Sequence, residues 1–162
     1  MKFQNISTLN LLTCLIFAAL FCFSGQNITA QNASLKVSNI KQKNIEGCGC
    51  GFQLPSEAQN KYSQKMIFFS EDNKTALMNI DGKDVKLKLS KAGARPRNEK
   101  KGNRFYEEYK TGTTTVRLDY LTTFTCAESS NEDCEAFGYN VTITVTKGNL
   151  KKVVKTSGAC GC

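Results

Sequence analysis

The sequence predicts an all-β domain, a small antiparallel β-barrel or sandwich of about six to seven strands, stapled by disulfides. Three observations predict it: apolar and polar residues alternate in several segments, an Asp-Gly pair joins two such segments, and cysteines mark both ends of the region. Strict alternation is typical of half-buried strands, and Asp-Gly favours a two-residue hairpin turn. A barrel and a sandwich produce the same pattern, so both remain open.

The amino terminus has the pattern of a secretion signal. The apolar run Leu11–Phe23 follows Met1-Lys2; it is shorter than the roughly 20 residues that span a bilayer but fits the apolar part of a signal peptide. We therefore expect residues 1–30 to be a signal peptide cleaved near Ala30 and the mature chain, secreted or periplasmic, to have no transmembrane segment. Residues 31–46 are polar and are predicted to form a flexible leader, and residues 47–162 form a single β domain.

The first elements of that domain are short. Pro55–Ser63 is predicted to hold one helix with Ser56 as its N-cap, and the apolar run Met66–Phe69 is consistent with a buried strand. Thr75–Leu89 predicts a hairpin around Asp81-Gly82. Folding there pairs Met78 with Val85 and Ala76 with Leu87 on an apolar face, and Leu77 with Lys86 and Thr75 with Lys88 on the other.

The carboxyl-terminal half continues the alternation. Thr114–Cys126 and Phe137–Val145 read as two strands, and Lys147-Gly148-Asn149 turns the chain into a last strand near Leu150–Thr156. The predicted core consists of Met66, Phe68, Met78, Val85, Leu87, Leu118, Tyr120, Phe124, Phe137, Tyr139, Val141, Ile143 and Val145.

Six cysteines follow the predicted signal peptide: Cys48, Cys50, Cys126, Cys134, Cys160 and Cys162. An even number in an exported chain indicates a disulfide framework. The simplest pairing joins the two Cys-Gly-Cys elements by two bridges and closes the 126–134 loop by a third. As an alternative, the four thiolates of the Cys-Gly-Cys elements could bind a soft metal or take part in thiol-disulfide exchange; the disulfide interpretation is favoured, with no metal and no cofactor expected.

The excess positive charge lies in one segment. The net charge of the chain is +8, and between residues 83 and 104 only Asp84 and Glu99 are acidic. The basic residues there are Lys83, Lys86, Lys88, Lys91, Arg95, Arg97, Lys100, Lys101 and Arg104. These nine residues are the predicted binding surface for an anionic surface or polymer, or for a protein partner.

The alternative interpretation of this segment is structural, because lysines on an edge strand discourage aggregation. Nucleic acid is the less favoured anion, since aromatic residues for base stacking occur only at the far end of the segment, at Phe105 and Tyr106. Nothing in the sequence indicates an oligomeric state. The sequons at Asn32, Asn73 and Asn140 imply glycans only in a eukaryotic host.

We expect no enzymatic activity and no catalytic residues. The chain has no histidine, which excludes Ser-His-Asp and Cys-His nucleophiles and histidine-ligated zinc. Glu107, Glu108 and Asp119 could supply a glycosidase-like carboxylate pair, but on alternating strands they are interpreted as surface acids.

One segment resembles a known family. Asp81-Gly82-Lys83 is followed by Ser90, Gly93, Ala94 and Arg95 in the spacing S-x-x-G-A-R, which is similar to the small bacterial C-type lysozyme inhibitors of the membrane-bound and periplasmic kind. The resemblance implies an exported β-barrel whose loop enters the lysozyme cleft. Pro96 stands where the family has Tyr, and the three-bridge cysteine layout departs from the family.

Overall fold

The computed structural model describes residues 34–43, 45, 47–58, 65–71, 74–126 and 135–162. The predicted signal peptide lies outside these ranges, as do residues 31–33, 44 and 46 of the predicted leader. Within the described residues, no helix is long and apolar enough to cross a membrane.

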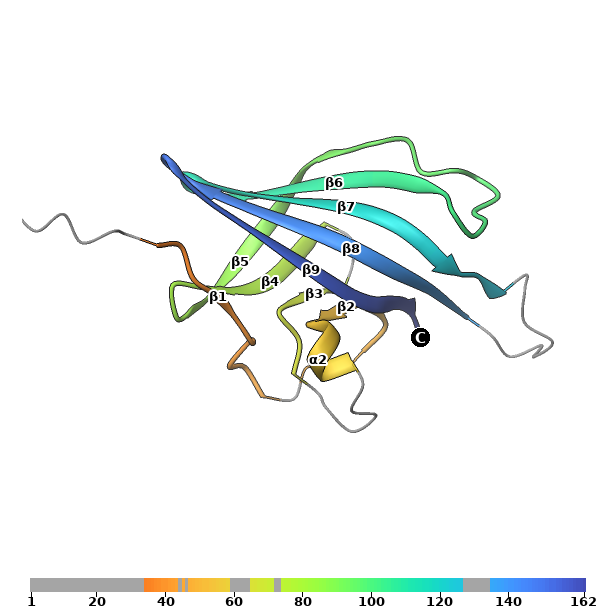
Figure 1. The fold of residues 1–162 in the computed structure, drawn as a ribbon, viewed down its shortest axis with the longest axis horizontal. Coiled ribbons are helices and arrows are strands. Elements are labelled where there is room, and N and C mark those ends of the chain that lie inside the picture. The colour runs from red at the N-terminus through yellow and green to blue at the C-terminus, as the bar shows by residue number, and fades with distance from the viewer. Residues whose placement is uncertain (1–33, 44, 46, 59–64, 72–73, 127–134) are drawn as a thin grey trace, which may run out of the picture. The chain divides into compact units, whose positions relative to one another are not determined.

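Antiparallel strands form almost the whole described chain (Figure 1). In chain order the elements are β1 (Val37–Ser38), β2 (Gly49–Gln53), α2 (Pro55–Ala58), β3 (Phe68–Ser70), β4 (Thr75–Ile80), β5 (Lys83–Ala92), β6 (Arg104–Thr111), β7 (Thr114–Phe124), β8 (Ala136–Lys147) and β9 (Leu150–Gly161).

The sheet closes on itself. Its strand order is β1-β4-β3-β2-β9-β8-β7-β6-β5, and β5 also pairs with β4. Eight strands therefore form a closed barrel to which β1 adds a short ninth strand along β4. This confirms the all-β, disulfide-stapled fold class and selects the barrel. The strand count is slightly higher than predicted, because the prediction did not include β1, β2 and β6.

The predicted hairpin is confirmed residue by residue. Met78 pairs with Val85, Ala76 with Leu87, Leu77 with Lys86 and Thr75 with Lys88. Asp81 and Gly82 both have positive φ, at 53° and 77°, as a type I′ turn requires. Local turn chemistry and the alternation thus fix the register of β4 and β5 together.

The barrel interior is filled by aromatic and aliphatic side chains. Tyr120 is at its centre, with ring centroids 4.4 Å from Phe105, 5.4 Å from Tyr139 and 5.7 Å from Phe52. Most of the predicted core residues are buried or pack against the core. Among the described residues, the buried core also contains residues that the prediction omitted: Leu35, Cys50, Phe52, Ile67, Ala76, Ile80, Phe105, Tyr109 and Val116.

Two predicted core residues are misplaced. Phe124 is 39% exposed, because the pairing of β7 with β8 shifts between Thr122 and Phe124 and the bulge interrupts the alternation. Met66 is only partly buried and precedes the strand; its sulfur lies close to Gly51, where a Cβ would come within 2.7 Å of it.

The leader makes contacts that the prediction did not include, and the helix is described over only part of its predicted range. Leu35 is buried, and β1 pairs with β4 through Val37 and Ser38, contacts that the prediction of a flexible leader did not anticipate. The helix spans Pro55–Ala58, and the rest of the predicted range, 59–63, lies outside the described residues. Of the three sequon asparagines, Asn140 is exposed on β8. Asn32 and Asn73 lie outside the described residues.

Candidate functional site: a basic groove on the barrel wall

Two disulfides join the Cys-Gly-Cys elements. Cys48 is bonded to Cys162 and Cys50 to Cys160, at the place where β2 pairs with β9. The strands approach closely there, since a Cβ at Gly158 would collide with the carbonyl of Gly51. This pairing is the one that the sequence predicted. Cys126 is also disulfide-bonded, and its predicted partner, Cys134, lies outside the described residues.

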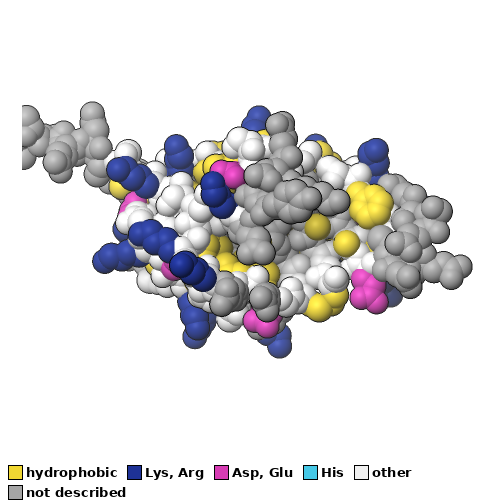
Figure 2. Space-filling view, turned by 90° about the horizontal axis from the view of Figure 1, so that it is seen from below, with side chains coloured by type: hydrophobic (Ala, Val, Ile, Leu, Met, Phe, Trp, Pro, Cys, Tyr) yellow, Lys and Arg dark blue, Asp and Glu magenta, His cyan; other side chains and the backbone are white. Residues whose placement is uncertain are grey.

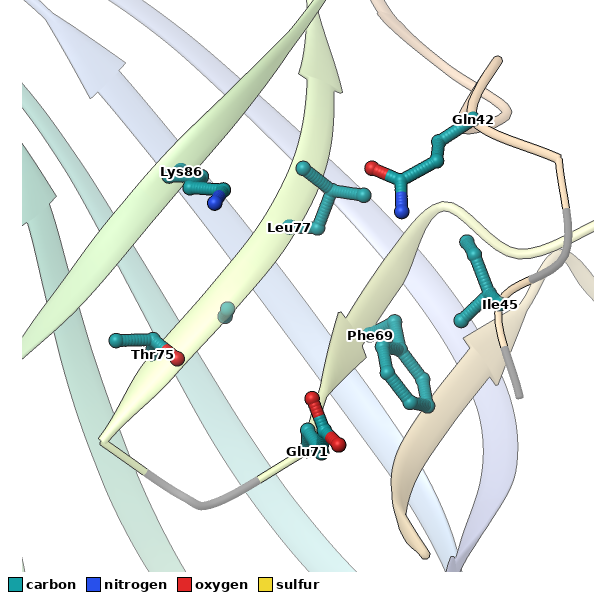
Figure 3. Close-up of a pocket in the computed structure, with 8 residues that line it drawn as sticks. Gln42, Ile45, Phe69, Glu71, Thr75, Leu77 and Lys86 are labelled. Carbon is teal, nitrogen blue, oxygen red and sulfur yellow. The ribbon is translucent and has the colours of Figure 1, made fainter. Parts of the chain in front are cut away.

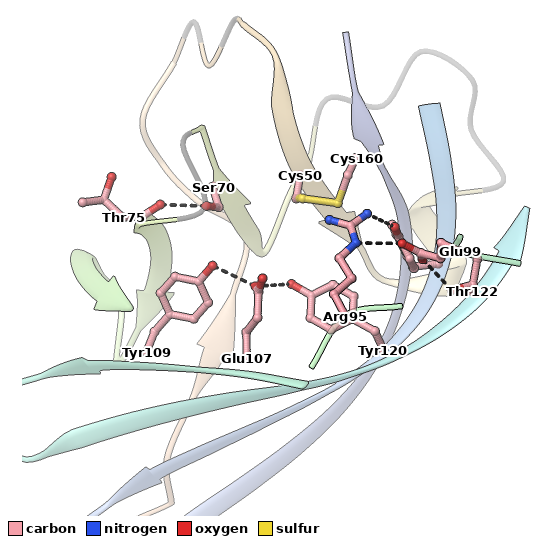
Figure 4. The surroundings of a disulfide bond; sticks show 11 residues. Cys50, Ser70, Thr75, Arg95, Glu99, Glu107, Tyr109, Tyr120, Thr122 and Cys160 are labelled. Atoms are coloured by element: carbon pink, nitrogen blue, oxygen red, sulfur yellow. Dashed lines mark hydrogen bonds and ion pairs between the residues drawn. A yellow bond between two sulfur atoms is a disulfide. The ribbon is translucent and has the colours of Figure 1, made fainter. Parts of the chain in front are cut away.

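These bridges bear on the thiol-based alternatives. Four of the sulfurs that could have acted as thiolate ligands are engaged in bonds to each other, and Cys50 is buried beside the barrel interior (Figure 4). In the described ranges, no three Cys, Asp or Glu side chains are arranged so that they could hold a metal ion. Metal binding by these sulfurs would first require reduction of the bridges, and thiol-disulfide exchange would require an external thiolate to attack one of them.

The loop after β5 is anchored to the barrel rather than free. The Gly93 amide donates to the carbonyl of Tyr106 and the Gly102 amide to that of Thr122. Within the loop, the Arg95 Nε donates to Glu99 Oε2 at 2.7 Å, and the Thr122 hydroxyl donates to Glu99 Oε1 at 2.6 Å (Figure 4). The Glu99 side chain is only 4% exposed.

The Arg95 guanidinium contacts other side chains of the barrel as well as Glu99. A terminal nitrogen of its guanidinium donates to the Tyr139 hydroxyl at 2.6 Å, and the guanidinium carbon lies 5.2 Å from the ring centroid of Phe105. Burial alone would raise the pKa of Glu99, but the hydrogen bonds from Thr122 and Arg95 lower it. Arg95 therefore neutralises the Glu99 carboxylate. Because its guanidinium makes these contacts within the fold, Arg95 is less available to an anionic partner than the other predicted cations.

The remaining predicted cations fall into two groups along the chain. Lys83, Lys86, Lys88 and Lys91 are exposed on β5. Arg97, Lys100, Lys101 and Arg104 are exposed on the loop and at the start of β6. Lys88 lies opposite Lys110, and six residues of β6 separate Lys110 from Arg104, a distance of about 20 Å along the strand. The structure thus does not bring all nine predicted residues into one surface.

A shallow groove of about 460 Å³ lies beside β5 and β6. Three lysines line it: Lys86, Lys88 and Lys110. Lys88 and Lys110 are direct cross-strand partners, and Lys110 is the one that sequence reasoning missed. No pattern in the sequence indicated Lys110, because it lies opposite Lys88 only through the pairing of β5 with β6, which a long loop separates in the chain.

Two neighbouring recesses contain charges of both signs. One, of about 410 Å³, has Ile45, Phe69 and Leu77 on its walls, with Glu71 and Lys86 at different sides (Figure 3). Another, of about 360 Å³, contains Lys83 and the ion pair between Lys147 and Asp81, at 2.7 Å. Of the three recesses, only the groove of Lys86, Lys88 and Lys110 is lined by lysines without a carboxylate.

The carboxylates considered for catalysis do not share one face. Glu107, interpreted as a surface acid, points into the barrel and accepts hydrogen bonds from the Tyr109 and Tyr120 hydroxyls at 2.9 and 2.8 Å (Figure 4). Burial, together with this carboxylate, raises the pKa of Tyr120 well above its usual value. Asp119 pairs with Arg117 at 2.8 Å.

The segment that resembles the lysozyme inhibitors makes contacts within the chain. The Ser90 hydroxyl donates to the carbonyl of Glu108 at 2.8 Å, and Arg95 faces Glu99 as described above. Comparison with protein families, with curated proteins and with solved structures gives no match to the chain. The site is therefore interpreted from its own geometry.

Proposed function

We propose that this protein is a non-enzymatic binding domain, held by disulfides, that contacts an anionic partner through the basic segment 83–104, with its strand lysines contributing more than its loop. The observation that carries the proposal is the groove in which Lys86, Lys88 and Lys110 lie together. Export to an oxidising compartment is part of the proposal, because disulfides are typical of secreted and periplasmic proteins.

The placement of Lys88 argues against the purely structural alternative. Lysines protect exposed sheet edges, but Lys88 has a neighbouring strand on each side, since it pairs with Thr75 of β4 and with Lys110 of β6. An edge-protecting role therefore does not explain it. Two like charges directly opposite each other destabilise a sheet, and a bound anion relieves that repulsion.

The groove lysines are also largely uncompensated. Among the described residues, no carboxylate forms an ion pair with Lys86 or Lys88, and Lys110 contacts Glu108 at 3.6 Å. In the space-filling view of Figure 2, lysine and arginine side chains project around the outline of this face, and acidic side chains are fewer. Such a surface attracts anions over a distance set by the salt concentration.

The test compares two triple variants with the same change in charge. The groove variant replaces the three groove lysines, as Lys86→Ser/Lys88→Ser/Lys110→Ser. The loop variant replaces three exposed loop cations, as Arg97→Ser/Lys100→Ser/Lys101→Ser. We expect the wild-type protein to bind a heparin column and to be released by salt. The groove variant should be released at a clearly lower salt concentration, and the loop variant should shift less.

Equal shifts for the two variants would show that net charge alone governs retention and would overturn the assignment to the groove. Absent or salt-independent retention of the wild-type protein would overturn the proposed function itself. All the substituted side chains are exposed, so neither variant should unfold at a markedly lower temperature than the wild type.

The other hypotheses stay predictions. The thiol-based function is tested by counting free thiols by intact mass before and after alkylation, on protein purified without reductant; thiols released only by a chelator would support it. The resemblance to lysozyme inhibitors is tested by adding micromolar protein to lysozyme-driven cell lysis, where no effect would end it.

A further inference from the structure

The groove continues into a row of side chains around the barrel. Strand register places Thr75, Lys88, Lys110, Thr115, Thr146 and Lys151 opposite one another on successive strands, from β4 through β9. Cross-strand partners point to the same face. Their face is the outer one, because the alternate positions Leu87, Tyr109, Val116 and Val145 are buried in the core.

The spacing of the row follows from sheet geometry. Neighbouring strands lie about 4.8 Å apart, so Lys88 and Lys110 are about 5 Å apart and Lys151 is about 14 Å beyond Lys110. Thr115 and Thr146 fill the interval with hydroxyl groups, which can donate to anionic oxygens. The row therefore offers cations at both ends and hydrogen-bond donors between them.

Acidic residues are excluded from this row but not from those beside it. The next row contains Lys91, Glu108, Arg117 and Thr144. The row after that contains Tyr106, Asp119, Thr142 and Lys155. The row from Lys88 to Lys151 thus lacks the acidic residues that offset cations in the two rows beside it.

The line is unsuited to stacking bases. In the adjoining rows the aromatic ring is Tyr106, and the Arg117 guanidinium carbon lies 4.0 Å from its centroid, so that one face of the ring is covered. Non-specific binding of single-stranded nucleic acid depends on stacking on exposed aromatic rings as well as on charge. A row of lysines and threonines favours a polymer that presents anionic groups and hydroxyls instead.

We propose that the anionic partner is a linear anionic polysaccharide that lies across the strands, along the row from Lys88 to Lys151. This inference rests on the proposed function and deepens it, since it names the class of partner and extends the site to β9. The polymer's anionic groups contact Lys88 and Lys110 at one end of the row and Lys151 at the other.

The experiment uses heparin oligosaccharides of increasing length and two single variants on β9. Lys151→Ser removes the far end of the row. Lys155→Ser is the matched control, because Lys155 is an exposed lysine on the same strand and face but lies in the row that contains Asp119. Dissociation constants are measured by calorimetry over a range of salt concentrations.

For oligosaccharides long enough to span the row, Lys151→Ser should weaken binding about fivefold, the effect of one lysine near an anionic surface. The slope of the logarithm of affinity against the logarithm of salt concentration should fall by about one charge. For a disaccharide, which reaches only one end, the same variant should change little. Lys155→Ser should have a smaller effect at every length.

Each other outcome has a distinct meaning. If heparin binds but Lys151→Ser and Lys155→Ser behave alike, the row is overturned while the proposed function stands. If the wild-type protein does not bind heparin, both fail. If single-stranded DNA of equal charge binds as tightly as the long oligosaccharide, the assignment to a polysaccharide is overturned.

Discussion

Asp84 ties the amino-terminal segment to the barrel. Its carboxylate accepts hydrogen bonds from the backbone amides of Lys41 and Gln42, at 2.9 and 2.7 Å, and from the side-chain amide of Asn79 at 2.6 Å. Burial alone would raise the pKa of Asp84, but these hydrogen bonds lower it. Because the pKa of Asp84 is lowered in the folded state, its contribution to the free energy of unfolding depends on pH.

We expect Asp84→Asn to lower the free energy of unfolding at pH 7 by about 1 kcal/mol. If its single oxygen keeps the two backbone hydrogen bonds, its NH2 group faces the Asn79 side-chain amide, which then loses its acceptor. A carboxylate with a lowered pKa stabilises the fold above its unfolded pKa of about 3.9, and this contribution is lost as the pH falls through the folded pKa. The difference between wild type and variant should therefore shrink below pH 4. Urea unfolding at pH 7 and pH 3 measures it, and an unchanged difference would contradict the assignment.

Arg95 shows how the same residue type serves different roles within one segment. It pairs with the nearly buried Glu99, whereas Arg97, two residues later, is exposed and has no ion pair among the described residues. Removal of a cation from a buried carboxylate leaves that charge uncompensated.

Arg95→Met should therefore lower the free energy of unfolding by about 2 kcal/mol, less than for a fully buried pair because Arg95 is partly exposed. The matched change Arg97→Met should stay within about 0.5 kcal/mol of wild type. Urea unfolding at neutral pH compares them. Equal stabilities of the two variants would refute the anchoring role of Arg95.

At the scale of elements, β2 and β9 join the beginning and the end of the barrel. Their sequence separation is large, with bridged residues 114 and 110 positions apart. Pairing such distant strands costs loop-closure entropy. The two bridges offset this cost in the unfolded chain.

Removing one bridge should lower the free energy of unfolding less than removing the second bridge afterwards. Cys48→Ala/Cys162→Ala or Cys50→Ala/Cys160→Ala alone should cost about 2 kcal/mol, because the remaining bridge keeps the long loop closed; removal of the second pair should cost about 5 kcal/mol more. Urea unfolding of both double variants and of the quadruple variant tests this. Loss of folding in either double variant, or equal costs per pair, would contradict it.

At the scale of the whole molecule, closure of the sheet decides which charges lie together. β5 follows β4 through a two-residue turn, but it pairs with β6 only after the long loop at 93–103. Lys110 therefore joins the lysines of β5, whereas Arg97, Lys100 and Lys101 lie at the other end of β6 although they are nearer in sequence. Surface charge thus follows strand register rather than position along the chain.

Much of the local structure was predictable. The register of β4 and β5 follows from Asp81-Gly82 and the alternation on each side, because a short turn leaves only one pairing that places the apolar residues together. Likewise, the two Cys-Gly-Cys elements have equal spacing, which permits two parallel bridges between paired strands. Phe124 was misassigned because a bulge changes the alternation without leaving a mark in the sequence.

The sequence by itself determined the strand-rich fold class, the hairpin and the pairing of the Cys-Gly-Cys elements, since these depend on alternation, turn residues and spacing over short distances or at matching ends. Only the tertiary structure decided that the sheet closes into a barrel, that Arg95 and Glu107 are satisfied internally, and that Lys88 and Lys110 adjoin. These features depend on contacts between strands far apart in the chain, and a single sequence records no such contacts because each strand's pattern is compatible with many neighbours.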